Sequence, residues 1–105
     1  MKIILFIDTS DSQKISVAIE VGGKKVEKVV DAKQGKAQMV LPMVEELLKS
    51  QKLTSSDITE INVNTGPGSF TGLRVGIAVA QMLGTLLSIT VNGKRPGEPI
   101  EPIYG

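Results

Sequence analysis

The most informative segment is Thr65-Gly66-Pro67-Gly68-Ser69-Phe70-Thr71-Gly72-Leu73-Arg74, a glycine-rich turn between two apolar runs. The run before it, Glu60–Asn64, is typical of a strand, and the run after it predicts a helix over Phe70–Leu87. Backbone N–H groups at a helix start attract anions, so Gly66, Gly68 and Ser69 are a candidate phosphate site. However, the segment lacks the lysine of a Walker A loop, and Pro67 has no N–H to donate. The alternative is a tight turn in which Ser69 or Thr71 caps the helix.

The predicted helix carries minimal side chains at every fourth position, a spacing that places them on one stripe: Gly68, Gly72, Gly76, Ala80 and Gly84. Glycine inside a helix costs up to about 1 kcal/mol relative to alanine, so another backbone must pack closely there. That neighbour is either the chain's own sheet or first helix, or a helix of a partner. Residues 75–91 are nearly uncharged. We interpret them as part of a buried core or interface helix rather than a membrane span.

The rest of the chain predicts a β-β-β-α-β-α order with a mixed sheet. The expected earlier elements are strands at Lys2–Asp8, Lys14–Val21 and Lys24–Asp31, and a helix at Lys36–Lys49. The first strand reads as central and covered on both faces, Gly22-Gly23 closes an antiparallel hairpin, and Pro42 either kinks the helix or marks its start. We expect one domain over residues 1–91 and an extended proline-rich tail over residues 92–105.

A second candidate site follows the first strand. Asp8, Thr9 and Ser10 stand at a strand end, where ligands of α/β proteins usually bind. Asp8 could hold Mg²⁺ through a water, with the two hydroxyls donating to phosphate. The alternative is a turn that only satisfies the backbone. Arg74 could pair with Asp8, bind an anion or stay solvated.

Composition excludes several classes of function. The 105 residues contain neither cysteine nor histidine, which removes thiol, triad and imidazole chemistry. Aromatic residues are 3% and the net charge is +1, which argues against strong nucleic-acid binding. Carboxylates at Asp8, Asp11, Glu20 and Asp57 form no readable metal cluster. The absence of cysteine suits the cytoplasm.

Three blocks of sequence carry a resemblance to a known family, namely residues 4–10, residues 40–48 and Gly66-Pro67-Gly68-Ser69-Phe70-Thr71-Gly72-Leu73-Arg74-Val75-Gly76-Ile77-Ala78. They resemble the TsaB (YeaZ) family, which takes part in the threonylcarbamoyladenosine modification of tRNA. The resemblance covers about residues 2–88. It implies an α/β fold of the ribonuclease-H-like, actin-like ATPase (ASKHA) type.

The resemblance also implies a role. Members of the family are non-catalytic subunits that pair with the catalytic paralogue TsaD through two helices, and the ATPase TsaE joins the assembly. Carried over to this chain, the partner interface would consist of Met39, Val40, Met43, Val44, Leu47, Gly72, Gly76 and Ala80. We therefore expect an accessory subunit without enzymatic activity, metal or required cofactor, and a homodimer where the partner is absent.

The chain differs from the family pattern in two respects. Family members usually carry a histidine where this chain has Lys36, and they are about twice as long, with a second lobe. A natural short form and a fragment both fit. Two other hypotheses remain open: a small module that binds ATP or ADP with Mg²⁺ through Asp8–Ser10 and Gly66–Ser69, and a structural homodimer.

Overall fold

The computed structural model describes residues 1–31 and 36–103, which form a five-stranded sheet with strand order β3-β2-β1-β4-β5. In chain order the elements are β1 (Ile3–Asp8), β2 (Lys14–Val21), β3 (Lys24–Asp31), α1 (Lys36–Ser50), a short 3₁₀ turn (Ser55–Asp57), β4 (Glu60–Val63), α2 (Phe70–Leu87) and β5 (Thr90–Val91). The first three strands are antiparallel, whereas β4 and β5 run parallel to β1. The predicted mixed sheet and element order are confirmed, with β5 added.

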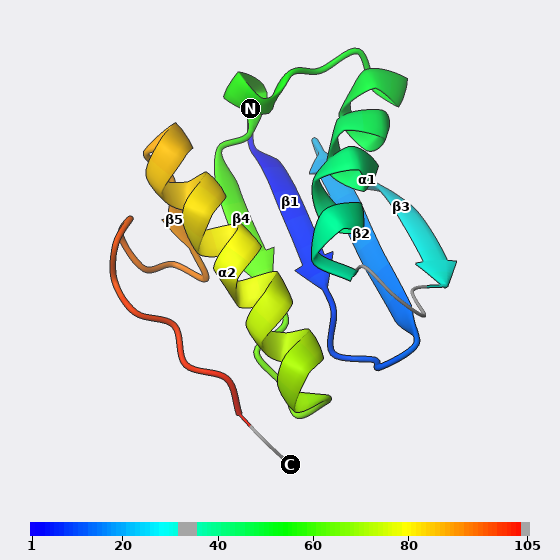
Figure 1. Ribbon diagram of the computed structural model, residues 1–105. Helices are drawn as coiled ribbons and strands as arrows, with labels where there is room; N and C mark the ends of the chain where they lie inside the picture. Colours follow the sequence, from blue (N-terminus) through cyan, green and yellow to red (C-terminus); the bar gives the residue numbers. More distant parts are fainter. Residues whose placement is uncertain (32–35, 104–105) are drawn as a thin grey trace.

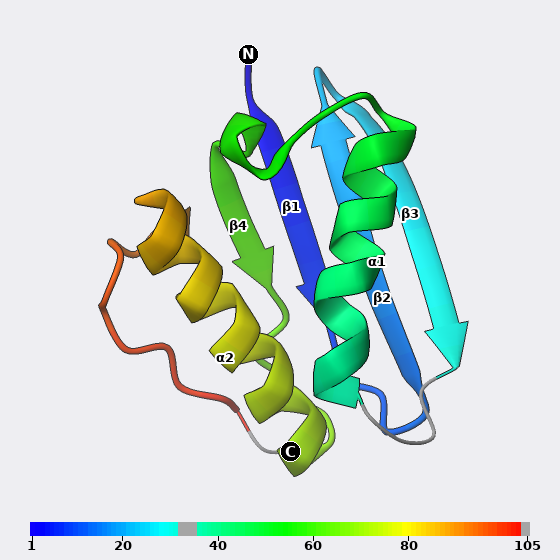
Figure 2. The same ribbon diagram turned by 45° about the horizontal axis from the view of Figure 1, so that its top comes forward.

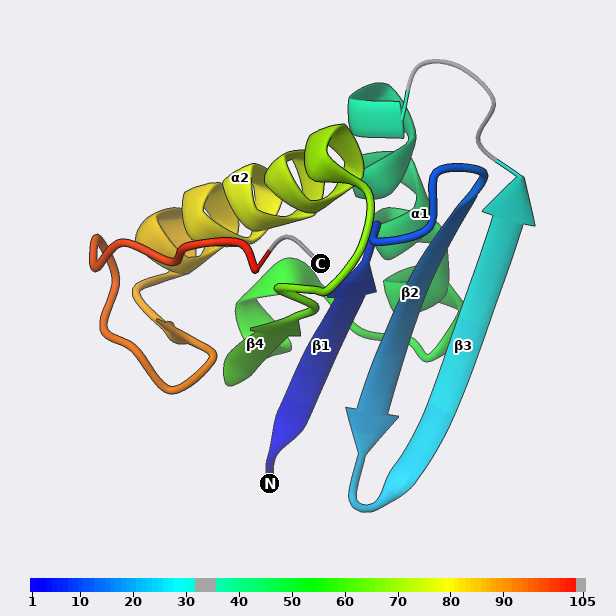
Figure 3. The ribbon, with the colours of Figure 1, turned by 90° about the horizontal axis from the view of Figure 1, so that it is seen from below.

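Both helices lie on the same face of the sheet, α1 over β2 and β3 and α2 over β4 and β1 (Figure 1; Figure 2). Seen from below, the opposite face of β1 and β2 has no helix on it (Figure 3). The burial of β1 alternates accordingly: Ile3, Leu5 and Ile7 are buried, and the residues between them are half-buried. The prediction that this strand is covered on both faces is therefore wrong. Its apolar residues are continuous in sequence, but their exposure alternates between buried and half-buried.

The α1 helix continues through Pro42, so the alternative that the helix begins at this proline is wrong. Pro42 is exposed, and Val40, Met43 and Val44 on either side of it are buried against the sheet. Because the ring faces away from the core, it does not disturb the packing of this apolar face. The described part of the structure thus keeps one helical segment from Lys36 to Ser50.

By length and mean hydropathy, 1.4 over 18 residues, α2 could cross a membrane. Its surroundings are those of a core helix, because Leu73, Ile77, Ala80 and Leu83 pack into the chain's own core. Apolar character on the remaining sides is left facing outward.

After β5 the chain returns along α2 as an extended segment (Figure 1). Ile100 is buried in the core, the Gln81 side chain donates to the carbonyl of Glu98, and Ile103 N–H donates to Thr65 O at 2.6 Å. The predicted extended tail therefore packs on the domain as far as residue 103. Tyr104 and Gly105 lie outside the described residues.

Candidate functional site

The two candidate loops meet where β1 and β4 end and α2 begins. Strand register places Ile7 beside Val63, which brings Asp8–Ser10 against the glycine segment. Ser69 N–H donates to Ser10 O at 2.8 Å. A Cβ added to Gly68 would lie 2.7 Å from Ser10, so only glycine allows this approach. The structure thus brings together the residues that the sequence suggested: Asp8, Thr9, Ser10, Gly66, Gly68 and Ser69.

The carboxylate of Asp8 is held by its neighbours. Oδ1 accepts from Ser10 N–H at 2.9 Å and from Ser10 Oγ at 2.6 Å. Partial burial raises the pKa of Asp8, but these hydrogen bonds, together with one from Asn64, outweigh burial and leave the pKa below its ordinary value. Asp8 therefore remains ionised at neutral pH.

Asn64 joins the two loops, a role that the sequence reading missed. Its amide nitrogen donates to Ser10 Oγ at 3.2 Å, and its oxygen accepts from Gly66 N–H at 2.9 Å. Like Asp8, Asn64 is a polar residue at the end of a strand, and this position can be recognised from the sequence. Its importance depends on β4 pairing directly with β1, which the sequence shows only indirectly.

Thr9 has a structural role instead of the predicted ligand role. It is completely buried, and its hydroxyl donates to the carbonyl of Gly72 at 2.5 Å. A Cβ on Gly76 would lie 2.3 Å from the same oxygen. Thr9 therefore fits between the end of β1 and α2, where no ligand can reach it.

The remaining groups of the site also satisfy one another. Ser69 caps α2, with its Oγ accepting from Gly72 N–H at 3.3 Å, as the capping alternative predicts; Thr71 does not serve as the cap. Arg74 lies over the Phe70 ring at 5.5 Å, and the structure gives it no ion pair with Asp8. Among the described residues, no three potential metal ligands gather. The geometry favours a self-contained turn, and nucleotide binding stays a hypothesis.

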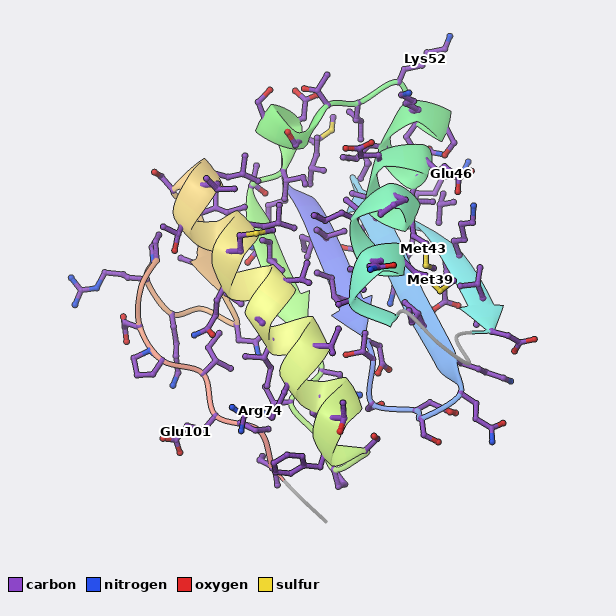
Figure 4. All side chains as sticks on the ribbon, in the orientation of Figure 1. Met39, Met43, Glu46, Lys52, Arg74 and Glu101 are labelled. Atoms are coloured by element: carbon purple, nitrogen blue, oxygen red, sulfur yellow. The ribbon has the colours of Figure 1, made fainter. Side chains whose placement is uncertain are left out.

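The predicted partner interface lies largely inside the chain. Val40, Met43, Val44, Leu47 and Ala80 are at most 5% exposed, and Gly72 and Gly76 are also buried. Met39 is half-buried, and Figure 4 shows Met39 and Met43 between α1 and the sheet. Seven of these eight residues are buried within this chain, so a partner cannot contact them as a surface, and Met39 packs partly against the core. The prediction failed because apolar spacing marks a buried face without showing what buries it.

The glycine stripe has the same explanation. Gly76 packs against Thr9, and a Cβ on Gly84 would lie 2.5 Å from the Val91 side chain. Of the alternatives left open by the sequence, the neighbour that needs these glycines is the chain's own sheet.

An apolar surface does remain on α2, facing away from the sheet. We call it the α2 ridge and define it by Phe70, Arg74, Val75, Ala78, Val79, Met82 and Leu86. Phe70 is 57% exposed, Met82 42% and Leu86 72%. Next to the ridge, a groove of about 520 Å³ separates α2 from Ala37 of α1. Figure 4 shows Arg74 extending from α2 toward the tail.

The chain is similar in sequence to proteins of known families. Residues 12–93 match the family model described as TsaD, tRNA N6-adenosine threonylcarbamoyltransferase. The tRNA threonylcarbamoyladenosine biosynthesis protein TsaB of Buchnera aphidicola (Schizaphis graminum) is 36% identical over 93 residues, which cover 87% of this chain and 43% of that protein. TsaB of Escherichia coli is 38% identical over 80 residues, covering 76% of this chain and 34% of that protein.

A solved structure agrees with the sequence comparisons. YeaZ from Pseudomonas aeruginosa superposes with a TM-score of 0.81 at 35% identity, covering 87% of this chain and 42% of that one. The chain spans less than half the length of these relatives. The shared sequence and the shared mixed sheet with its helical layer lead to one conclusion: the chain belongs to the TsaB (YeaZ) family, within the wider group that the TsaD model describes.

Proposed function

We propose that this protein is a non-catalytic scaffold subunit in the biosynthesis of tRNA threonylcarbamoyladenosine. In this proposal its helical layer binds a TsaD-like catalytic partner in the cytoplasm, and a TsaE-like ATPase joins the complex. Relatives over the matched region carry the name of that biosynthetic process. Since the match covers less than half of each relative, the role is proposed for the one lobe that is present.

The observation that carries the proposal is the α2 ridge. Exposed apolar side chains on a single helix face, next to a groove, are typical of a surface that another protein covers. The match to the TsaD model adds a geometric argument, because the proposed partner would contain a lobe of the same design. Two such lobes can pair through equivalent helical faces, as isologous interfaces do.

The chemistry of the chain supports a role without catalysis. The sequence has no cysteine or histidine, and Asp8 is engaged by Ser10 and Asn64 in closing a turn. The Thr9 side chain is buried, and its hydroxyl donates to the carbonyl of Gly72, so it is not available to a substrate. The polar groups of this loop are therefore accounted for by hydrogen bonds within the fold, without a reaction.

The proposal keeps the helices as the interface but moves the contact residues from the buried face to the α2 ridge. A Gly76→Leu substitution is consequently a poor test, because it would collide with Thr9 and disturb folding. Ala78 is exposed in the middle of the ridge and lines the groove. Its substitution by glutamate would place a charge in the interface while leaving the core intact.

The experiment is co-purification of the tagged chain with the TsaD-like protein of the same organism. The wild type and Val29→Glu should retain the partner, and Ala78→Glu should lose it. Val29 is a matched control because it is exposed and apolar but lies on β3, remote from α2. Circular dichroism melting verifies that both variants fold. Failure of the wild type to retain the partner, or equal retention by Ala78→Glu, would show that the proposed role or surface is wrong.

A homodimer would cover the same ridge when the partner is absent. Light scattering of the isolated protein should then show a dimer that Ala78→Glu converts to a monomer. A concentration-independent monomer would remove the structural homodimer as an alternative and leave the heteromeric proposal to the co-purification.

A further inference from the structure

The face of the sheet without helices contains a hollow of about 290 Å³. Strand register puts four of its residues in one row across the sheet: Asn62 of β4, Phe6 of β1, Ala18 of β2 and Glu27 of β3. Ala18 is only 1% exposed, so the half-buried Phe6 ring supplies the accessible apolar surface of the hollow. Asp8 and Ser16 form the next row toward the strand ends.

The hollow has an apolar floor and a polar rim. Phe6 forms the accessible floor with Ala18 buried beneath it, and Asn62 also lines the hollow. Across the residues that the structure describes, the Asn62 amide makes no hydrogen bond, although the residue is half-buried. A few polar groups converging on an apolar surface are characteristic of small-molecule sites. The unpaired side-chain amide of Asn62 can therefore offer a ligand both a donor and an acceptor.

Lys25 adds a flexible cover. Its ammonium lies 4.2 Å from the centre of the Phe6 ring, although the side chain is exposed and long. A cation over an aromatic face is held only weakly at exposed sites. A flat ligand that stacks against this face of Phe6 must therefore displace the Lys25 ammonium from the ring.

The rim excludes several ligand classes. Asp8 and Glu27 bring two carboxylates against the single ammonium of Lys25, which disfavours phosphate and other strong anions. No three potential metal ligands gather in the described part of the chain, so a metal ion lacks a ligand set. What fits is a small, uncharged, planar ring with hydrogen-bond donors on its edge.

We propose that this hollow binds a nucleobase that carries an exocyclic amino group, stacked against Phe6 and hydrogen-bonded at its edge by Asn62. Asparagine pairs with adenine through one donor and one acceptor, and a carboxylate such as Asp8 accepts from an exocyclic amine. Base-on-aromatic stacking supplies most of the affinity. The inference concerns the bare face of the sheet and stands apart from the α2 ridge and its proposed partner.

The test is a titration of the ¹⁵N-labelled protein with adenosine, followed by amide chemical shifts. Adenosine is chosen because it has no phosphate, so the glycine loop at residues 66–69 has no anion to bind. Saturable shifts are expected around Phe6, Ala18 and Asn62. Purine riboside, which lacks the amino group, should bind more weakly than adenosine.

Variants locate the contacts. Phe6→Leu should weaken adenosine binding roughly five- to 150-fold through lost stacking. Asn62→Ala should reduce the preference for adenosine over purine riboside, because only Asp8 then remains to accept from the amino group, and this variant leaves Phe6 in place if the leucine variant fails to fold. Val29→Ala, on the same sheet face but outside the hollow, should bind like the wild type. The proposal is overturned by the absence of saturable shifts at millimolar adenosine, by shifts centred on the glycine loop, or by unchanged affinity in Asn62→Ala together with Phe6→Leu.

Discussion

Thr9, directly after β1, packs against Gly76 of α2. The Thr9 hydroxyl donates to Gly72 O, and the absence of a side chain at position 76 leaves room for it. Each residue alone looked like something else in the sequence: a phosphate-binding hydroxyl and part of a partner-binding stripe. Their pairing across 63–67 positions could not be predicted, because a single sequence does not show which buried polar group meets which glycine.

A double-mutant cycle tests this pair. Gly76→Ala should destabilise the wild type by about 1–3 kcal/mol through overpacking against Thr9 Oγ1. In a Thr9→Ala background the same change should be much less harmful, because the oxygen is gone and alanine favours a helix by up to about 1 kcal/mol. Urea unfolding measures all four proteins. Additive free energies of unfolding would contradict the contact.

Asp8 predicts a pH dependence of stability. Its pKa is lower in the folded chain than the ordinary 3.8, so the unfolded state binds the proton more readily. The carboxylate therefore stabilises the fold above pH 3.8, and this stabilisation disappears as the pH falls through the lower folded-state pKa. Urea unfolding of the wild type and Asp8→Asn should differ most near neutral pH and converge in acid. A gap that widens below pH 3.8 would show the opposite sign.

Among the secondary-structure elements, β5 is one that the sequence alone does not predict. The hairpin β2–β3 was predicted to the residue, because Gly22-Gly23 and a β-branched alternation mark it locally. The two-residue strand β5 has no such pattern, and it exists because Thr90 and Val91 pair with β4 some 30 positions earlier. Asn92 completes this pairing: its side chain accepts from Val63 N–H at 2.8 Å and donates to Val63 O at 3.0 Å.

Asn92 variants test how β5 is attached. Asn92→Ala should destabilise the protein by about 1–3 kcal/mol, because Val63 loses both hydrogen bonds and alanine disfavours the positive φ of 51°. Asn92→Gly tolerates this φ and isolates the hydrogen bonds, so it should lie between alanine and the wild type. The readout is the free energy of unfolding in urea. If Asn92→Ala is as stable as the wild type, the two hydrogen bonds between Asn92 and Val63 contribute nothing to stability.

At the scale of the whole molecule, the fold and the family could be inferred from the chain, but the surface that acts could not. Hydrophobic spacing identified α1 and α2 and their apolar faces, and the glycine segment identified the family. The same spacing cannot separate a face buried by the sheet from one left for a partner. The structure makes that separation, because Ala80 and Val40 are fully buried while Met82 and Leu86 are exposed.

The ridge also predicts a stability effect on assembly. A TsaD-like partner that binds only the folded chain should raise its melting temperature, and the rise should grow with the logarithm of partner concentration above the Kd. Ala78→Glu should remove this rise without changing the melting temperature of the isolated chain by more than a few degrees, since exposed substitutions usually change stability by less than about 0.5 kcal/mol. Because the chain has no tryptophan and one tyrosine, the melting of each protein is followed by the fraction that stays soluble after heating, resolved by gel electrophoresis. A partner-induced rise retained by Ala78→Glu would contradict the ridge.

Hydrogen–deuterium exchange of the chain, alone and with saturating TsaD-like partner, tests whether the α2 ridge is the surface that the partner covers. If it is, exchange should be slower in peptides spanning Phe70–Leu87 and in the neighbouring start of α1, with peptides of β2 and β3 unchanged. Unchanged exchange in α2, or protection confined to the sheet strands, would contradict it.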